Sequence, residues 1–85
     1  MRLDKYLKVS RLIKRRVVAK EMVDAGRVKI NGKVAKPGNG VKVGDELEIG
    51  FGQRQTRARI LDIRETVRAN EASELYALIE GEQIE

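Results

Sequence analysis

The spacing of the apolar residues changes once along this chain, and the change falls at Gly26. Before Gly26, apolar residues recur three or four positions apart, as on one face of an α-helix, and after it they alternate with polar residues, as in a β-strand. Glycine is also the residue that most often follows the end of a helix. The sequence therefore predicts helices first and strands after them, which is the order of a segregated α+β domain.

The first third of the chain predicts two helices. Leu3 and Leu7 lie four residues apart and indicate a short helix over residues 2–8. A second helix is expected over about residues 15–25, after a brief polar connection at residues 10–14. Its predicted apolar stripe consists of Val18, Ala19, Met22 and Val23.

Short strands and a third helix are expected in the rest of the chain. Asn31-Gly32 is the strongest short signal for a tight hairpin turn, and Gly50 and Gly52 suggest a bulge or a close approach of backbones. A longer strand is expected over about residues 56–64, with a bulge near residues 61–63. Asn70 suits the N-cap of a last helix, which would end at Gly81. The buried residues predicted for that helix are Ala72, Leu75, Tyr76 and Ile79.

Composition limits the function of the chain. Its 85 residues suffice for one domain, residues 1–85, and they include no Cys and no His. The usual zinc ligands and catalytic triads are therefore missing, so we expect no metal, no cofactor and no enzymatic activity. Neither a membrane span nor a signal peptide is evident, so a cytoplasmic protein is expected. A monomer is also expected, because no apolar interface patch is evident in the sequence.

The charge is distributed unevenly. Residues 1–33 hold 11 Lys or Arg against three acids, a net charge of +8, whereas residues 34–85 carry a net charge of −3. Such a basic segment can be an ordinary solvated surface, but an excess this large and this local favours a polyanionic partner. Arg15 and Arg16 also stand at the start of the second helix, where positive charge is locally unfavourable unless an anion binds there. The basic residues of the predicted surface are Arg2, Lys5, Arg11, Lys14, Arg15, Arg16, Lys20, Arg27 and Lys29.

Other polyanions fit the sequence less well than folded RNA does. The helices are short for a helix-turn-helix that reads DNA, and the basic helix lacks the bulky apolar face that inserts into a membrane. The chain has only three aromatic residues, too few for a platform that stacks unpaired bases. We therefore expect recognition of folded RNA by shape and phosphate position, without DNA or membrane binding.

Three segments of the sequence resemble a known RNA-binding family. These are Arg2–Leu7, Lys14–Gly32 with its arginine pair and Asn31-Gly32 turn, and Gly44-Asp45-x-Leu47. Together they resemble the S-four, or alpha-L, RNA-binding domain over about residues 1–50. The resemblance implies an α+β fold in which two N-terminal helices pack on a small, mostly antiparallel sheet. Residues 51–85 would complete this fold with a strand and a short C-terminal helix.

The whole chain is most similar to the RqcP family, whose members act in bacterial ribosome-associated quality control. This resemblance implies binding to large ribosomal subunits that carry an obstructed peptidyl-tRNA, with contacts to rRNA and to the tRNA in the peptidyl site. A partner factor on the same subunit would then add alanine residues to the stalled chain without mRNA. The RNA-contacting core would be Arg2, Asp4 and Arg16, with Asp4 orienting an arginine. Asn31 of the hairpin turn joins the predicted RNA-binding residues.

Two alternatives remain open on the sequence. The related fifteen-kilodalton heat-shock protein family shares the motif and also binds large subunits, but its members usually carry a long basic C-terminal extension. A structural or assembly protein that binds rRNA and never contacts a tRNA is the other alternative. Whether Arg15 contacts RNA or the first helix is also open, because the family often has Ser or Thr at that position.

Overall fold

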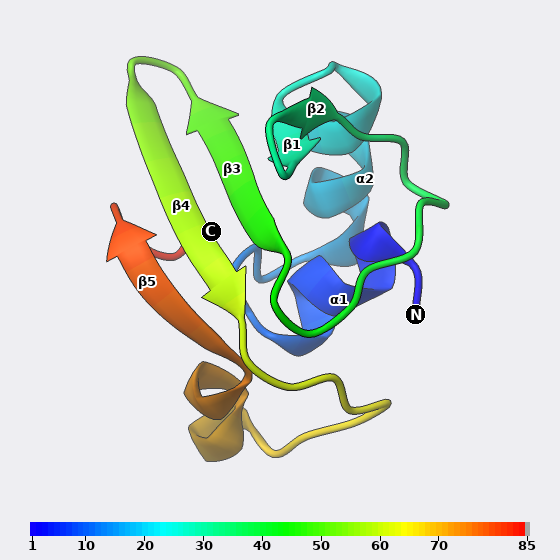
Figure 1. Ribbon diagram of the computed structural model, residues 1–85, viewed down its shortest axis with the longest axis vertical. Helices are drawn as coiled ribbons and strands as arrows, with labels where there is room; N and C mark the ends of the chain where they lie inside the picture. The colour runs from blue at the N-terminus through cyan, green and yellow to red at the C-terminus, as the bar shows by residue number, and fades with distance from the viewer. Residues whose placement is uncertain (85) are drawn as a thin grey trace.

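A computed structural model describes residues 1–84 and shows two helices on one face of a five-stranded antiparallel sheet (Figure 1). The elements follow the chain as α1 (Leu3–Val9), α2 (Arg16–Asp24), β1 (Val28–Ile30), β2 (Lys33–Val34), β3 (Glu46–Phe51), β4 (Arg54–Ile60), the 3-10 helix η1 (Ala69–Leu75) and β5 (Tyr76–Glu80). The predicted α+β class, with helices before strands, is confirmed. Both α-helices lie within one residue of their predicted ends.

The sheet has the order β2-β1-β3-β4-β5, with every neighbouring pair antiparallel. Asn31 and Gly32 join β1 to β2, and both have positive φ, as a tight hairpin turn requires. A second two-residue turn, Gly52-Gln53, joins β3 to β4. Gly50 donates its N–H to the carbonyl of Arg27 at 2.8 Å, a hydrogen bond between neighbouring strands.

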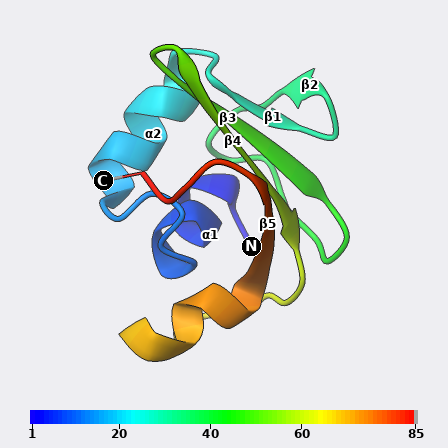
Figure 2. The same ribbon diagram turned by 90° about the vertical axis from the view of Figure 1, so that its left-hand side faces the viewer.

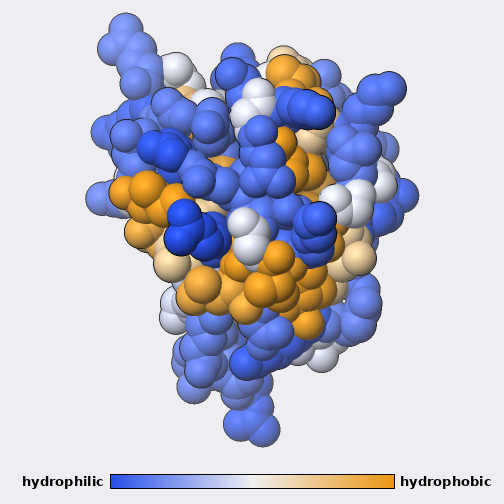
Figure 3. Space-filling view, viewed as in Figure 1, coloured by the Kyte–Doolittle hydropathy of each residue, from blue (hydrophilic) through white to orange (hydrophobic). Residues whose placement is uncertain are grey.

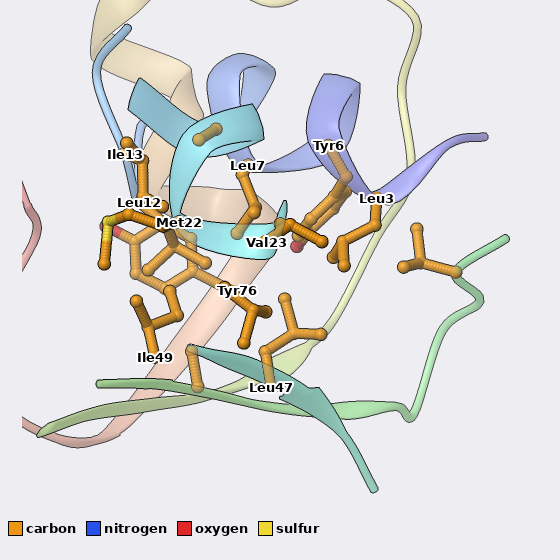
Figure 4. Packing of buried hydrophobic residues seen from close by; sticks show 14 of the residues in the cluster. Leu3, Tyr6, Leu7, Leu12, Ile13, Met22, Val23, Leu47, Ile49 and Tyr76 are labelled. Atoms are coloured by element: carbon orange, nitrogen blue, oxygen red, sulfur yellow. The ribbon is translucent and has the colours of Figure 1, made fainter. Parts of the chain in front are cut away.

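The hydrophobic core fills the space between the helices and the inner face of the sheet (Figure 2). Leu3, Tyr6 and Leu7 of α1 point from one side, and Leu47 and Ile49 of β3 meet them from the other (Figure 4). The Tyr6 hydroxyl donates to the carbonyl of Leu75 at 2.7 Å, and burial raises the pKa of this phenol. Tyr6 therefore stays neutral and holds α1 to the end of η1.

The connection between α1 and α2 differs from the short polar linker expected at residues 10–14. Leu12 and Ile13 are completely buried, and Ser10 is buried with its hydroxyl bonded to the Leu7 carbonyl at 3.3 Å. A left-handed residue, Arg11 with φ of 60°, turns the chain so that these two apolar side chains reach the core. A run of only two apolar residues carries no periodicity, so the sequence pattern did not predict that Leu12 and Ile13 are buried.

The C-terminal region corrects the predicted last helix. Residues 69–75 form a 3-10 helix that begins after Arg68 rather than at Asn70, and residues 76–80 form strand β5. Ala72, Leu75 and Tyr76 are buried as expected, but Ile79 is 44% exposed. Without β5, strand β4 would be an open edge of the sheet with unpaired backbone groups. Pairing of residues 76–80 with β4 is therefore more favourable than continuing the helix through these residues.

Strand β4 and the glycine after β5 also differ from expectation. β4 ends at Ile60, and the N–H groups of Leu61 and Asp62 both donate to the Leu75 carbonyl, at 2.8 and 3.2 Å. The bulge predicted near residues 61–63 is therefore wrong, and the irregularity lies between Arg57 and Ala58 instead, opposite β5. Gly81 follows a strand and not a helix, with φ of 80°.

Candidate RNA-binding surface

The predicted RNA-contacting core forms one cluster at the start of the two helices. The carboxylate of Asp4 is almost completely buried, with its side chain 4% exposed, and it accepts two hydrogen bonds from the Arg2 guanidinium, at 3.1 and 3.2 Å. An Arg16 guanidinium nitrogen lies 3.6 Å from the same carboxylate. Asp4 thus holds two arginines that are distant in the sequence, as expected for an orienting residue.

Backbone contacts fix Asp4 in place. Its carboxylate also accepts the N–H of Lys5 at 2.8 Å. The first N–H groups of α1 donate to the loop after β2, from Leu3 to the Asn39 carbonyl at 2.8 Å and from Asp4 to the Pro37 carbonyl at 3.3 Å. Such bonds satisfy donors that a helix leaves free at its start. The start of α1, which carries Asp4, is therefore held by backbone hydrogen bonds to residues 37–39.

The two arginines remain accessible although they share a buried anion. Arg2 and Arg16 have side chains 56% and 51% exposed, so each guanidinium keeps free N–H donors toward solvent. They line a shallow pocket, here called the helix surface, that consists of Arg2, Asp4, Arg16, Val17 and Lys20. Arginines held in a fixed plane are well suited to bind phosphate oxygens with paired hydrogen bonds.

Sequence reasoning missed Val17 on this surface. Val17 is 70% exposed, whereas Ala19, Met22 and Val23 of the same helix are buried. Helical spacing was the available signal, because Val17 stands three residues before Lys20 and off the apolar stripe. An exposed aliphatic side chain between cations can pack against a ribose while the cations contact phosphates.

The start of α2 adds backbone donors to the helix surface. Arg15 is the N-cap residue, and no side-chain hydrogen bond caps the helix. The unpaired N–H groups of the first turn and the positive end of the helix dipole both favour an anion there. Arg15 itself is exposed.

Lys5, Arg11, Lys14 and Asn31 lie outside the helix surface. Lys5 forms an ion pair with Glu65, and that hydrogen bond lowers the pKa of Glu65. Arg11 is half-buried in the connection after α1, and Lys14 lies beside the C-terminal residues, where its N–H donates to the Ile84 carbonyl at 3.0 Å.

The amide of Asn31 is occupied within the protein. It donates to the carboxylate of Asp45 at 3.0 Å and accepts the N–H of Glu46 at 2.9 Å, which joins the β1–β2 turn to the start of β3. This side chain therefore shapes the hairpin, and its contact with RNA stays a prediction.

Arg27 and Lys29 lie at the opposite end of α2 from Arg16. They line a different groove, on the side of the sheet away from the helices, together with residues of the β3–β4 hairpin. The structure therefore divides the basic residues of the first third between two places. Across residues 1–84 it shows no group of His, Cys, Asp and Glu that could hold a metal ion. Within that range no helix has the length and apolar character needed to cross a membrane.

The chain is similar to RNA-binding proteins in sequence. Residues 1–47 match the S4 domain family. The RQC P-site tRNA stabilizing factor of Halalkalibacterium halodurans is 57% identical over 84 residues, which cover 99% of this chain and 96% of that protein. The heat shock protein 15 homolog of Aeromonas salmonicida is 35% identical over 65 residues, which cover 76% of this chain and 49% of that protein.

The fold is also similar to a solved structure. The trimeric structure of Vibrio cholerae Heat Shock Protein 15 matches with a TM-score of 0.83 at 37% identity, covering 92% of this chain and 80% of that one. The resemblance drawn from the sequence is therefore confirmed, both in the domain and in the subgroup. The chain belongs to the S4 domain family and, within it, to the family of RQC P-site tRNA stabilizing factors.

Proposed function

We propose that this chain is a non-catalytic factor of ribosome-associated quality control that stabilises tRNA in the peptidyl site of obstructed large subunits. It binds subunits that carry a peptidyl-tRNA, contacts rRNA through the helix surface, and contacts the tRNA as well. A partner factor on the same subunit then adds alanine residues to the stalled chain without mRNA. The names of its relatives support the tRNA-stabilising role.

The observation that carries the proposal is the cluster of Arg2, Asp4 and Arg16. A buried carboxylate costs desolvation, and the folded chain compensates that cost by ordering two arginines beside it. Ordered guanidiniums lose less entropy when they bind a phosphate than flexible ones do. The cluster therefore favours a folded RNA with phosphates at fixed positions over diffuse attraction of any polyanion.

A recycling factor of the heat-shock type is the second candidate, because the Vibrio cholerae structure has the same fold. The share of each relative's length that the match covers favours the tRNA-stabilising factor. The match spans 96% of the Halalkalibacterium protein but only 49% of the Aeromonas heat shock protein 15 homolog. A structural or assembly protein that binds rRNA alone is the third candidate, and it would not distinguish subunits with tRNA from empty ones.

Replacement of Arg16 by Ala tests the helix surface. We expect Arg16→Ala to weaken binding to obstructed large subunits by about 1–3 kcal/mol, the range for charge-assisted hydrogen bonds to phosphate. Arg59→Ala is the matched control, because Arg59 is also exposed and has no ion pair among residues 1–84, but lies on β4 away from the helices. Equal affinities of the two variants at moderate salt would exclude the helix surface as the binding site.

A further inference from the structure

A second hollow with unpaired positive charge lies at the end of the β3–β4 hairpin. Three glycines line it: Gly26, Gly50 and Gly52. Gly26 and Gly52 have positive φ, so side chains there would be strained. Three cations line it as well: Arg27, Lys29 and Arg54.

These three cations lack acidic partners. Among residues 1–84, none of Arg27, Lys29 and Arg54 forms an ion pair, and all three are exposed. On the same strands, by contrast, Arg57 pairs with Glu46, and this ion pair raises the pKa of the Arg57 guanidinium. Arg57 is thus neutralised within the sheet, whereas the three cations around the hairpin end keep their charge uncompensated. One acid, Glu48, also lines the groove. With three cations and one acid, the groove keeps a net positive charge.

The groove also offers neutral polar groups. Gln53 and Gln55 line it from the hairpin, and Gln55 donates to Glu48 at 3.5 Å. This outer face of the sheet is seen in Figure 3, where the surface over the hairpin end is largely hydrophilic. Open backbone, cations and amides together suit the sugar-phosphate strand of a nucleic acid better than an apolar peptide or a lipid.

The groove is separate from the helix surface. No residue lines both. Arg16 begins α2 and Gly26 follows its end, so at a rise of ~1.5 Å per residue over the nine helical residues Arg16 and Gly26 are about 13 Å apart along the helix axis. One phosphate cannot contact both sites, and the chain therefore presents two places for RNA. A factor that stabilises one RNA on another needs two such places.

We propose that the groove formed by Arg27, Lys29, Gln53, Arg54 and Gln55 binds the sugar-phosphate backbone of the tRNA, while the helix surface binds rRNA. This inference rests on the proposed function and assigns its second RNA to a surface. Arg54 is the residue that the sequence did not single out, because it lies in the less basic part of the chain.

Arg54→Ala in the full chain tests the groove, with Arg59→Ala as the control on the same strand. Binding is measured to purified large subunits that carry a peptidyl-tRNA and to empty ones, without other protein factors. We expect Arg54→Ala to weaken binding to the tRNA-bearing subunits about 5- to 30-fold and to reduce the slope of log K against log salt by about 1. Binding to empty subunits should be unchanged, and Arg59→Ala should match the unmodified chain on both.

Two results would overturn the assignment. If Arg54→Ala behaves as Arg59→Ala does on both kinds of subunit, the groove does not bind RNA. If Arg54→Ala weakens both kinds equally, the groove contacts rRNA and not tRNA. Arg16→Ala, measured in parallel, keeps the two proposals apart, since unchanged binding of that variant would contradict the helix surface and leave the Arg54 result to be interpreted alone.

Discussion

At the scale of the residue, the carboxylate of Asp4 organises the helix surface. It is an acid at the centre of a basic surface, and a simple count of charge would predict that it weakens RNA binding. The structure gives it the opposite role, because it is buried and fixes the directions of Arg2 and Arg16. If Asp4 acts by orienting the arginines, its replacement should weaken RNA binding. If only net charge matters, the same replacement should strengthen it.

Asp4→Asn separates these two effects. The change adds one unit of positive charge, yet we expect RNA affinity to fall by about 1 kcal/mol, because Arg2 loses its charged hydrogen-bond acceptor and Arg16 loses its ion-pair partner. Glu65→Gln makes the same change of charge at an exposed site, where it releases Lys5, and it should leave affinity unchanged or raise it. Titration of both variants with large subunits measures the difference. Tighter binding of Asp4→Asn would show that charge alone matters.

At the scale of the element, the sequence predicted what long periodic patterns determine and missed what tertiary pairing determines. The helix α2 and the Asn31-Gly32 turn follow from local signals, and both were predicted. The stretch from Ala72 to Ile79 has apolar residues at spacings that suit a helix, so β5 was not anticipated. The orienting role of Asp4 was inferred only through family resemblance, and its burial was not anticipated, since no local pattern indicates burial of an acid.

Strand β5 makes a testable distinction between two of its residues. Tyr76 is 7% exposed and Ile79 is 44% exposed, whereas a helix continuing through both would bury both. We expect Tyr76→Ala to lower the free energy of unfolding by about 3–5 kcal/mol, and Ile79→Ala to lower it by much less. Circular dichroism melts compare the two. Similar losses for both variants would favour the helix over the strand.

The C-terminal residues form a second unanticipated element, a segment that holds the connection before α2. Ile84 is buried, its N–H donates to the Leu12 carbonyl at 2.7 Å, and its carbonyl accepts the N–H of Lys14 at 3.0 Å. The Thr56 hydroxyl donates to the Glu82 carbonyl at 2.7 Å. The segment therefore holds residues 12–14 in place, immediately before Arg15 and Arg16.

Gly81 is the turn that allows this arrangement. Its φ is 80°, and a Cβ there would lie 2.4 Å from the Gln55 carbonyl oxygen. We expect Gly81→Ala to lower the free energy of unfolding by more than ~1 kcal/mol, through strain and displacement of the segment. Gly38→Ala is the control, because its added methyl group would meet open space. Chemical denaturation measures both, and equal stability of the two variants would contradict the packing of this segment.

At the scale of the whole molecule, the acidic part of the chain leaves most of the basic surface open. Glu65 reaches Lys5, but Arg64 pairs with Asp62 inside the C-terminal region. Sequence charge alone placed one basic face on the first third of the chain, and the fold divides that charge between the two ends of α2. This division of the basic residues depends on how the chain turns at Gly26 between α2 and β1. A count of charges along the sequence cannot show that turn.

The outer face of the sheet bears on the expectation of a monomer. That expectation assumed no apolar patch, but Figure 3 shows an apolar band across this face. The assumption that the surface lacks an apolar patch is therefore wrong, and the monomeric state stays a prediction without that support.

In the proposed function, this chain recognises a large subunit by the tRNA that the subunit holds as well as by its rRNA. We would test this by measuring the affinity of the unmodified chain for large subunits bearing a peptidyl-tRNA and for empty ones at one salt concentration. We expect at least ~10-fold tighter binding to the tRNA-bearing subunits, equivalent to about 1.4 kcal/mol from a second set of phosphate contacts. Equal affinity for the two would contradict it and favour a protein that binds rRNA alone.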